Sequence, residues 1–205
     1  MNADPIALFP LETVLFPGGY LPLQIFEVRY LDMIKRAIAD GRGFGVVSLA
    51  AGAEVRRPGQ TESLAGVGTI ATIRASTAPM AGLMQIECIG TTRFSISSSE
   101  CLRNGLWVAQ VQPLAADRSI AVPDELSDVA EALGSLIQTL QDEHVEPGAM
   151  PIQAPFLLDQ CGWVANRWAE LLPMPVAQKL RLLELDNPLL RLELVQDLLH
   201  EHGVL

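Results

Sequence analysis

The sequence is short of positive charge and of long apolar runs, and each shortage excludes a class of protein. Lys35 and Lys179 are its only lysines, its arginines are scattered, and its formal net charge is −10. Such a chain lacks the basic stripe that neutralises a phosphate backbone, which argues against a nucleic-acid partner. No window approaches the roughly 20 uninterrupted apolar residues of a membrane span. The first residues carry no basic region before an apolar run. We therefore expect a cytoplasmic protein with no membrane partner.

Cysteine and histidine are also scarce, which argues against a disulfide framework and a metal site. Cys88, Cys101 and Cys161 are odd in number and widely spaced, with no Cys-x-x-Cys pair. Cys88 alternates with Ile86 in a strand-like pattern, which indicates core filler. His200-Glu201-His202 is the one ligand-like cluster, but positions i and i+2 of a helix point apart. We predict no metal.

Catalytic motifs are missing as well. The chain contains no Gly-x-x-x-x-Gly-Lys-Ser/Thr loop to cradle a phosphate, no Gly-x-Ser-x-Gly elbow and no His-Glu-x-x-His helix. Gly41-x-Gly43-x-Gly45 follows a predicted helix and precedes a predicted strand, the reverse of the order in a dinucleotide site. We therefore predict no cofactor and no enzymatic activity.

Residues 8–31 contain three prolines, and the spacing of their apolar residues changes from a strand-like to a helical period. Pro10, Pro17 and Pro22 lack a backbone donor and so favour edges, bulges and turns over the centre of a sheet. They predict a broken strand, Phe9–Phe16 and then Leu21–Ile25. Apolar residues then recur at helical spacing, which predicts a helix that ends near Gly41 and buries Val28, Leu31, Ile34 and Ile38.

A strand-like period continues to residue 113. The predicted strands are Phe44–Leu49, Val67–Arg74, Leu83–Ile89, Arg93–Ser97 and Leu106–Val111. Glycine and proline mark their joints at Gly52, Pro58-Gly59, Pro79 to Gly82, Gly90 and Asn104-Gly105. Several short strands with one early helix predict a bent sheet or open pseudo-barrel.

After Pro113 the period becomes helical. The sequence predicts a helix over Asp124–His144, then shorter pieces, and a last helix capped by Asn187. The shorter pieces are Phe156–Cys161, Val164–Leu172 and Val176–Leu185. With 49% hydrophobic and 19% charged residues the chain is globular. We expect an α+β protein with a β-rich subdomain over 1–113, a linker over 114–123 and a helical subdomain over 124–205.

Five segments, in order, resemble the N-terminal, substrate-binding domain of Lon proteases. The opening one is residues 8–31, within which Ile25-Phe26-Glu27-Val28-Arg29-Tyr30 is similar to the form found in small stand-alone members of that family. The others are Val67–Ile73, Ile89–Phe94, Val108–Leu114, and the pair Leu171–Met174 and Lys179–Glu184. Singly these motifs are weak, but in series they are specific and cover nearly the whole chain. Because the given sequence stops at Leu205, we expect neither the ATPase nor the Ser-Lys peptidase of the full-length proteases.

The resemblance implies a non-catalytic module that recognises polypeptide in protein quality control. Its partners would be unfolded or partly folded polypeptide and, as an open alternative, a separate protease or chaperone. Binding would use exposed apolar side chains and open sheet edges. The residues suspected of this role are Glu27, Arg29 and Tyr30, on the rim of a groove between sheet and helix, and Met80 and Leu83, at an exposed loop.

Other interpretations remain open. Glu27 and Arg29 also fit a purely structural role, as a capping carboxylate with a local ion pair. A small-molecule binder or uncharacterised enzyme would use a cleft between the two subdomains, and an assembly scaffold would use the apolar helical half. The sequence leaves the oligomeric state undecided.

Overall fold

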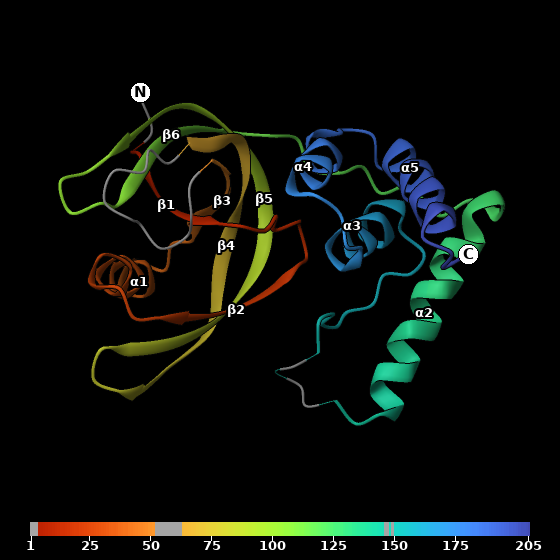
Figure 1. Cartoon of the computed structure of the whole chain (residues 1–205), viewed down its shortest axis with the longest axis horizontal. Helices are drawn as coiled ribbons and strands as arrows, with labels where there is room; N and C mark the ends of the chain where they lie inside the picture. The colour runs from red at the N-terminus through yellow and green to blue at the C-terminus, as the bar shows by residue number, and fades with distance from the viewer. Residues whose placement is uncertain (1–3, 52–62, 146–147, 149) are drawn as a thin grey trace. The chain divides into compact units, whose positions relative to one another are not determined.

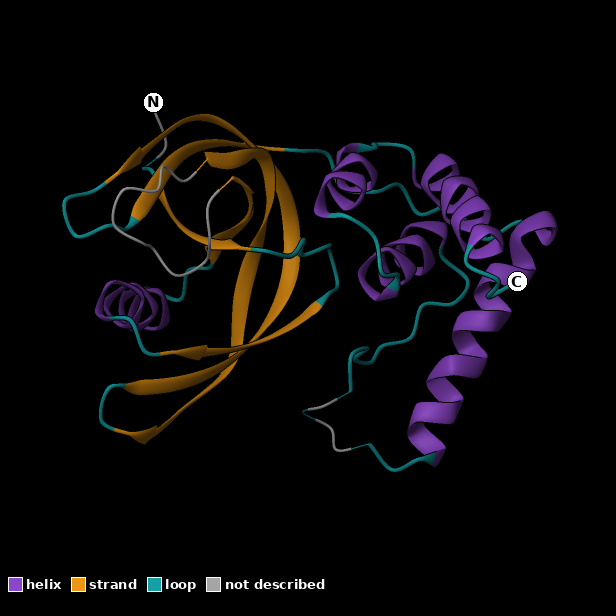
Figure 2. Ribbon diagram, viewed as in Figure 1, coloured by secondary structure: helices purple, strands orange, loops and turns teal. Residues whose placement is uncertain are grey.

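The computed structural model describes residues 4–51, 63–145, 148 and 150–205, which form two compact units, residues 1–114 and 115–205 (Figures 1 and 2). The described residues of the first unit contain β1 (Ile6–Leu11), β2 (Tyr20–Ile25), α1 (Val28–Asp40), β3 (Phe44–Ala51), β4 (Ser63–Met80), β5 (Leu83–Cys101) and β6 (Trp107–Pro113). Those of the second contain a 3₁₀ turn, η1 (Asp124–Leu126), and the helices α2 (Ser127–Asp142), α3 (Cys161–Leu171), α4 (Val176–Glu184) and α5 (Pro188–Glu201). The predicted α+β class, strands before helices, is confirmed. None of the helices in the described part of the chain is long and apolar enough to cross a membrane.

The six strands of the first unit form one sheet in the order β2-β5-β4-β3-β1-β6. β5 also pairs with β6, so five strands close into a ring and β2 stays outside it as an edge strand. The long strand β5 makes this possible because its first half pairs with β2 and its second half with β6. Bulges interrupt the β3–β4, β4–β5 and β5–β6 ladders, so the ring is not a regular barrel.

The prolines lie at edges, as predicted. Pro22 lies in the edge strand β2. Pro10 lies in β1 and pairs with β3, whereas β6 pairs with β1 only as far as Leu8. The predicted strand Phe9–Phe16 is wrong, since β1 starts at Ile6 and ends at Leu11. Beyond Leu11, side chains replace the ladder: the Ser48 hydroxyl donates to the Thr13 carbonyl at 2.7 Å and the Thr69 hydroxyl to the Leu15 carbonyl at 2.6 Å.

Helix α1 begins at Val28 and ends where predicted, with Gly41 terminating it in the left-handed conformation, φ 61°. The core of the unit lies where α1 meets the sheet, with Tyr30, Met33 and Ile34 against strand residues such as Phe44. The predicted buried face is partly wrong, because Val28 and Ile38 are exposed while Arg29 and Tyr30 are buried. Leu31 and Ile34 are buried as predicted, and Arg29 hydrogen-bonds the turn before β6.

The predicted hairpin is confirmed, but its arms are longer than expected. Met80 pairs with Leu83 across a two-residue turn in which Gly82 has φ 81°. The joint predicted at Gly90 is wrong, because β5 runs through it. Glycine is required there for a different reason: a Cβ would lie 2.2 Å from the Phe16 carbonyl oxygen. The predictions at Gly52 and Pro58-Gly59 lie outside the described residues.

In the second unit the predicted helices at Val164–Leu172 and Val176–Leu185, and the last helix, are confirmed as α3, α4 and α5. The Asn187 side chain caps α5 by accepting from the Leu189 and Leu190 amides. Trp168 is buried, and its indole N–H donates to the Val129 carbonyl at 3.0 Å. The helical piece predicted at Phe156–Cys161 is wrong. Its backbone instead bonds residues 120–122, with the Cys161 amide donating to the Ile120 carbonyl at 2.9 Å.

Candidate functional site

The start of α1 forms a small groove with the ends of two strands. β2 ends at Ile25, which points into the core, so strand alternation turns Phe26 outward. Glu27 is extended, φ −75° and ψ 132°, and the helix begins at Val28. The groove has a volume of about 110 Å³, and its lining is Phe9, Pro10, Leu11, Leu23, Gln24, Ile25, Phe26, Glu27 and Tyr30. It is therefore mostly apolar, with two polar side chains.

One ion pair holds the helix start. Arg29 Nε donates to Glu27 Oε2 at 2.9 Å, and Arg29 Nη1 donates to the Gly105 carbonyl at 2.6 Å. The local ion pair expected from the sequence is present, but the Glu27 side chain makes no capping hydrogen bond. Because Arg29 is buried and Glu27 only half-buried, the pair anchors α1 to the turn before β6 and leaves the carboxylate at the groove.

Two stacked rings form the aromatic wall of the groove. The Tyr30 ring stacks on Phe9 with centroids 4.2 Å apart and an interplanar angle of 30°. The Arg29 guanidinium lies 4.6 Å from the centroid of the Tyr30 ring. Tyr30 is thus held by a neighbouring ring and a cation, and both rings are buried.

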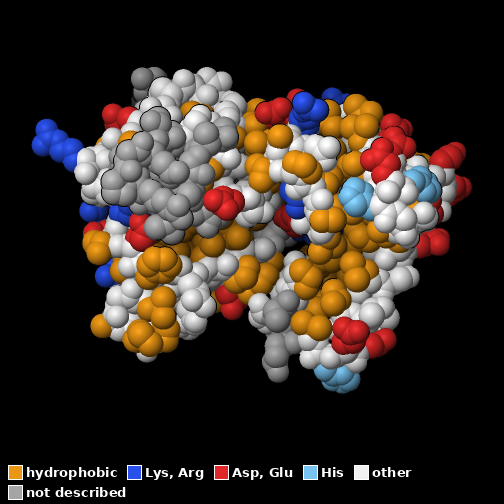
Figure 3. All heavy atoms as spheres, viewed as in Figure 1, with side chains coloured by type: hydrophobic (Ala, Val, Ile, Leu, Met, Phe, Trp, Pro, Cys, Tyr) orange, Lys and Arg blue, Asp and Glu red, His pale blue; other side chains and the backbone are white. Residues whose placement is uncertain are grey.

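Exposed apolar side chains lie at the start of α1 and at the tip of the β4–β5 hairpin. Phe26 is 62% exposed and Val28 is 72% exposed. Met80, at the tip of the β4–β5 hairpin, is 64% exposed, and its pair Leu83 is half-buried. On the face shown in Figure 3, orange hydrophobic side chains gather over the region where Figure 1 places α1, β2 and the hairpin. Large exposed apolar residues of this kind mark contact surfaces when they cluster.

The sequence-predicted residues fall into two groups. Glu27 and Tyr30 line the groove, and Arg29 lies behind them as their support. Met80 and Leu83 belong to the hairpin and do not line the groove. Phe26 was missed as a site residue, although strand alternation ending at Ile25 could have placed it outside. Whether any of the five binds a ligand stays a prediction.

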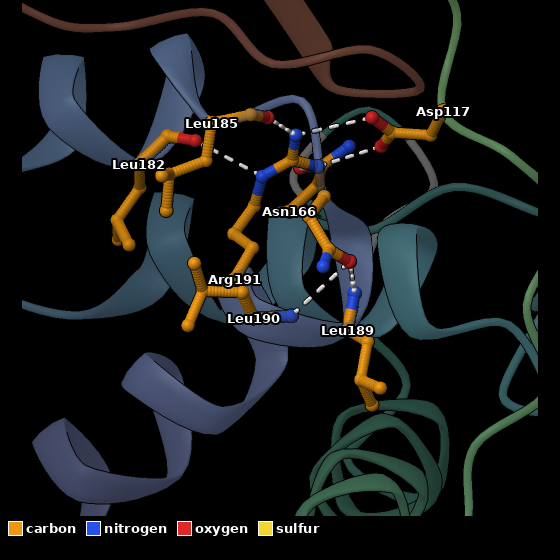
Figure 4. Close-up of polar contacts among 8 residues, drawn as sticks. Asp117, Asn166, Leu182, Leu185, Leu189, Leu190 and Arg191 are labelled. Carbon is orange, nitrogen blue, oxygen red and sulfur yellow. Dashed lines mark hydrogen bonds and ion pairs between the residues drawn. The ribbon is translucent and has the colours of Figure 1, made fainter.

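The second unit has a buried polar centre that the sequence did not reveal (Figure 4). Arg191 on α5 is 0% exposed, and its guanidinium donates to Asp117 Oδ2 at 2.6 Å and Oδ1 at 3.0 Å. It also donates to Asn166 Oδ1 and the Leu182 carbonyl, both at 2.9 Å, and to the Leu185 carbonyl. The network joins α3, the end of α4, α5 and the segment before η1. The network has a structural role, because the Asp117 carboxylate balances the positive charge of Arg191.

The candidate metal ligands of the described residues are dispersed, and two of the three cysteines are buried while Cys101 is exposed. The described residues hold no group of three or more His, Cys, Asp or Glu side chains that could bind a metal. Burial raises the pKa of the Cys88 thiol to about 12, which makes it unreactive near neutral pH. Cys161 is also buried, and burial raises the pKa of its thiol.

Comparison with known proteins places the chain in a family. The sequence profile of the substrate-binding domain of ATP-dependent protease La (Lon) matches residues 5–201, and the chain belongs to this family. Lon protease 2 of Myxococcus xanthus is 29% identical over an alignment of 204 residues that covers 95% of this chain and 23% of the relative. The Lon protease of Anaeromyxobacter dehalogenans (strain 2CP-C) is 29% identical over 203 residues, with the same two shares. The chain thus spans less than a quarter of the length of these curated relatives.

Solved structures agree with this assignment. The crystal structure of a Lon N-terminal domain protein from Xanthomonas campestris is 30% identical, with a TM-score of 0.72, over 95% of this chain and 98% of that one. The N-terminal domain of the Mycobacterium avium complex Lon protease is 17% identical, with a TM-score of 0.58, over 97% of this chain and 100% of that one. The second likeness concerns the fold alone.

Proposed function

We propose that this protein recognises unfolded or partly folded polypeptide through its N-terminal unit, as a non-catalytic substrate-recognition module. The observation that supports this most is the apolar groove at the start of α1, bordered by the exposed side chains of Phe26 and Val28. Membership of the Lon substrate-binding family supports the same function. A role in protein quality control, a separate protease or chaperone as partner, and a cytoplasmic location belong to the same proposal.

The hairpin tip is a second contact point within this proposal. Methionine is flexible and polarizable, so an exposed Met80 adapts to varied apolar segments. Leu83 is its cross-strand pair and extends the apolar surface of the tip. Glu27 and Arg29 contribute by fixing the helix start, and Tyr30 by closing the groove.

The size of the groove argues against the small-molecule alternative at this site. Ligand pockets for small molecules typically measure roughly 300–1,000 Å³. The groove at the start of α1 has about 110 Å³. It is therefore suited to part of a larger ligand, such as one side chain of a polypeptide, and not to a whole cofactor or metabolite.

The test is fluorescence anisotropy of a labelled, permanently unfolded polypeptide titrated with the protein, with a folded control of similar charge. We expect saturable, salt-tolerant binding of the unfolded chain alone. Phe26→Ala and Met80→Ala should each weaken it by about five- to thirtyfold, the range for losing one good contact residue. Leu190→Ala removes an exposed apolar side chain from the second unit and is the matched control.

Two results would contradict this proposal. Absence of binding at tens of micromolar protein would remove its central claim. Equal losses in Phe26→Ala and Leu190→Ala would assign binding to general surface hydrophobicity. Light scattering on the same samples addresses the scaffold alternative, which loses its support if the protein is monomeric at every concentration.

A further inference from the structure

Helix α5 has an apolar row on its surface, separate from the face that it buries. α5 packs on α3, and its buried apolar side chains are Leu192, Val195 and Leu199. Leu190 and Leu194 are 40% and 39% exposed, and Leu198 is half-buried. Since side chains four residues apart lie above one another on a helix, these three leucines form one continuous row.

An acidic row runs beside the apolar one. Glu193, Asp197 and Glu201 are exposed, and each follows a leucine of the apolar row by three residues. Residues three apart are also neighbours on a helix surface, so the two rows lie side by side. None of these carboxylates makes an ion pair or a side-chain hydrogen bond with another residue in the described part of the chain. A molecule that covers the leucines therefore meets three carboxylates whose charge no side chain balances.

The acidic row belongs to the unit that carries the whole net charge of the chain. The first unit contains as many Lys and Arg as Asp and Glu, so the net charge of −10 lies on the second. Two cations of the second unit, Arg167 and Arg191, are buried and paired with Glu170 and Asp117. Figure 3 shows red acidic side chains over the region where Figure 1 places α5. An occupant of the apolar row must therefore supply positive charge, because carboxylates that lose water need a compensating partner.

A second copy of this chain does not meet that requirement. Pairing of two α5 helices through their apolar rows would bring the two acidic rows together, and like charges across an interface oppose association. Nucleic acid and an anionic membrane surface are repelled for the same reason. A basic protein surface is the occupant that the charge favours.

The spacing of the two rows favours a helix on the side of the partner. Side chains four residues apart form ridges, and the ridges of one helix pack into the grooves between those of another. A partner helix with apolar and basic residues at the same four-residue spacing can cover the leucines and set a cation against each carboxylate.

We propose that the apolar and acidic rows of α5 together form a docking surface for a basic amphipathic helix of a partner protein. The inference goes beyond the proposed function, since this surface lies on the second unit and its ligand is a helix. The two kinds of binding differ in salt dependence. Docking on α5 depends on charge and weakens in salt, whereas recognition of unfolded polypeptide is expected to tolerate it.

The experiment uses the whole chain and three synthetic peptides, each about 18 residues long so that a helix can form. The first contains Leu and Lys in adjacent rows of four-residue spacing on an Ala background. The second has Glu in place of Lys, and the third has the composition of the first in an order that breaks both rows. Fluorescence anisotropy should show saturable binding of the first, at least about tenfold weaker binding of the third and none of the second. Salt should weaken the first, because the screening length falls from about 10 Å at 0.1 M to about 3 Å at 1 M.

Single variants connect this binding to the two rows. Leu194→Ala should weaken the first peptide about tenfold, the loss for one good contact residue. Asp197→Asn should weaken it by about two- to fivefold, the range of an exposed ion pair. The matched controls are Leu157→Ala, which removes a leucine that is 42% exposed, and Glu143→Gln, which neutralises an exposed carboxylate after α2. Both controls should bind like the wild type.

Reversal of the acidic row gives a readout that a misfolded variant cannot imitate. The triple variant Glu193→Lys, Asp197→Lys, Glu201→Lys should lose the Leu/Lys peptide and bind the Leu/Glu peptide instead. In the wild-type protein, NMR titration with the Leu/Lys peptide should shift amide signals of residues 190–201.

Several results would overturn the inference. Equal binding of the first and third peptides would reduce it to general charge attraction, and an equal loss in Leu157→Ala and Leu194→Ala would remove the apolar row from it. Amide shifts confined to the first unit would place the binding elsewhere. Dimers that form without peptide and are lost in Leu194→Ala would give the surface to a second copy. If the Leu/Lys peptide binds as described but the permanently unfolded polypeptide does not, the proposed function fails and this inference stands.

Discussion

Asp117→Ala should destabilise the second unit strongly, because it leaves the charge of Arg191 without the carboxylate that faces it. Arg191 is 0% exposed, and Asp117 accepts from both of its terminal nitrogens while being 18% exposed itself. Removing one partner of a buried ion pair costs about 3–5 kcal/mol. Asp117 is near the surface, so water can enter after the substitution, and we expect the lower end, about 3 kcal/mol.

The assay is urea unfolding followed by tryptophan fluorescence. Urea is preferred to guanidinium chloride because it does not screen charges. The chain has three tryptophans, of which Trp107 is in β6 and Trp163 and Trp168 are in α3. In a Trp107→Phe background the signal reports the second unit alone. With a slope of about 1 kcal/mol per molar urea, the midpoint should fall by roughly 3 M.

A double-mutant cycle with Arg191→Met tests the reasoning further. If the cost arises from the unpaired cation, the double variant should be more stable than the sum of the single changes predicts, since apolar replacement of both partners relieves it. Arg118→Ala, which changes the adjacent exposed residue, is the matched control. A loss below about 1 kcal/mol for Asp117→Ala, the range of an exposed ion pair, would refute the account.

Two further predictions concern the first unit. Cys88 has a folded-state pKa of about 12, so between pH 9 and 12 the unfolded state loses a proton that the folded state keeps. The free energy of unfolding should then fall by about 1.4 kcal/mol per pH unit more in the wild type than in Cys88→Ala; equal pH slopes in urea melts would contradict this. Gly90→Ala should lower the thermal midpoint by several degrees, because its Cβ would lie 2.2 Å from the Phe16 carbonyl oxygen. Gly66→Ala, with open space around its Cβ, is the control for calorimetry, and similar midpoints in the two variants would contradict the steric argument.

The two wrong predictions of secondary structure have a common physical cause. The strand predicted to reach Phe16 stops at Leu11 because Ser48 and Thr69 bond the carbonyls that follow it. The piece Phe156–Cys161 is not helical because its backbone bonds the chain about 40 residues earlier. In each case a partner distant in sequence competes with the local preference, and a local pattern contains no information about that partner.

The candidate site was predicted in part for the same reason. Glu27, Arg29 and Tyr30 were predicted because they are the polar residues of the segment that resembles the start of the Lon domain. The groove beside them could not be predicted, because part of its lining comes from β1 and its support comes from Gly105, which the Arg29 side chain reaches across 76 positions.

By itself, the sequence determined the family, through short motifs in series along nearly the whole chain. It also determined the succession of strands and helices, the edge positions of Pro10 and Pro22, and the caps at Gly41 and Asn187. These structural features depend on residues within one turn or one strand of each other, where periodicity and backbone sterics decide the outcome. Only the tertiary structure decided which side chains face solvent at the start of α1, and that Asp117 meets Arg191. Such contacts depend on how separate elements pack, so Phe26 borders a groove and Arg191 is buried for reasons that lie far away in the chain.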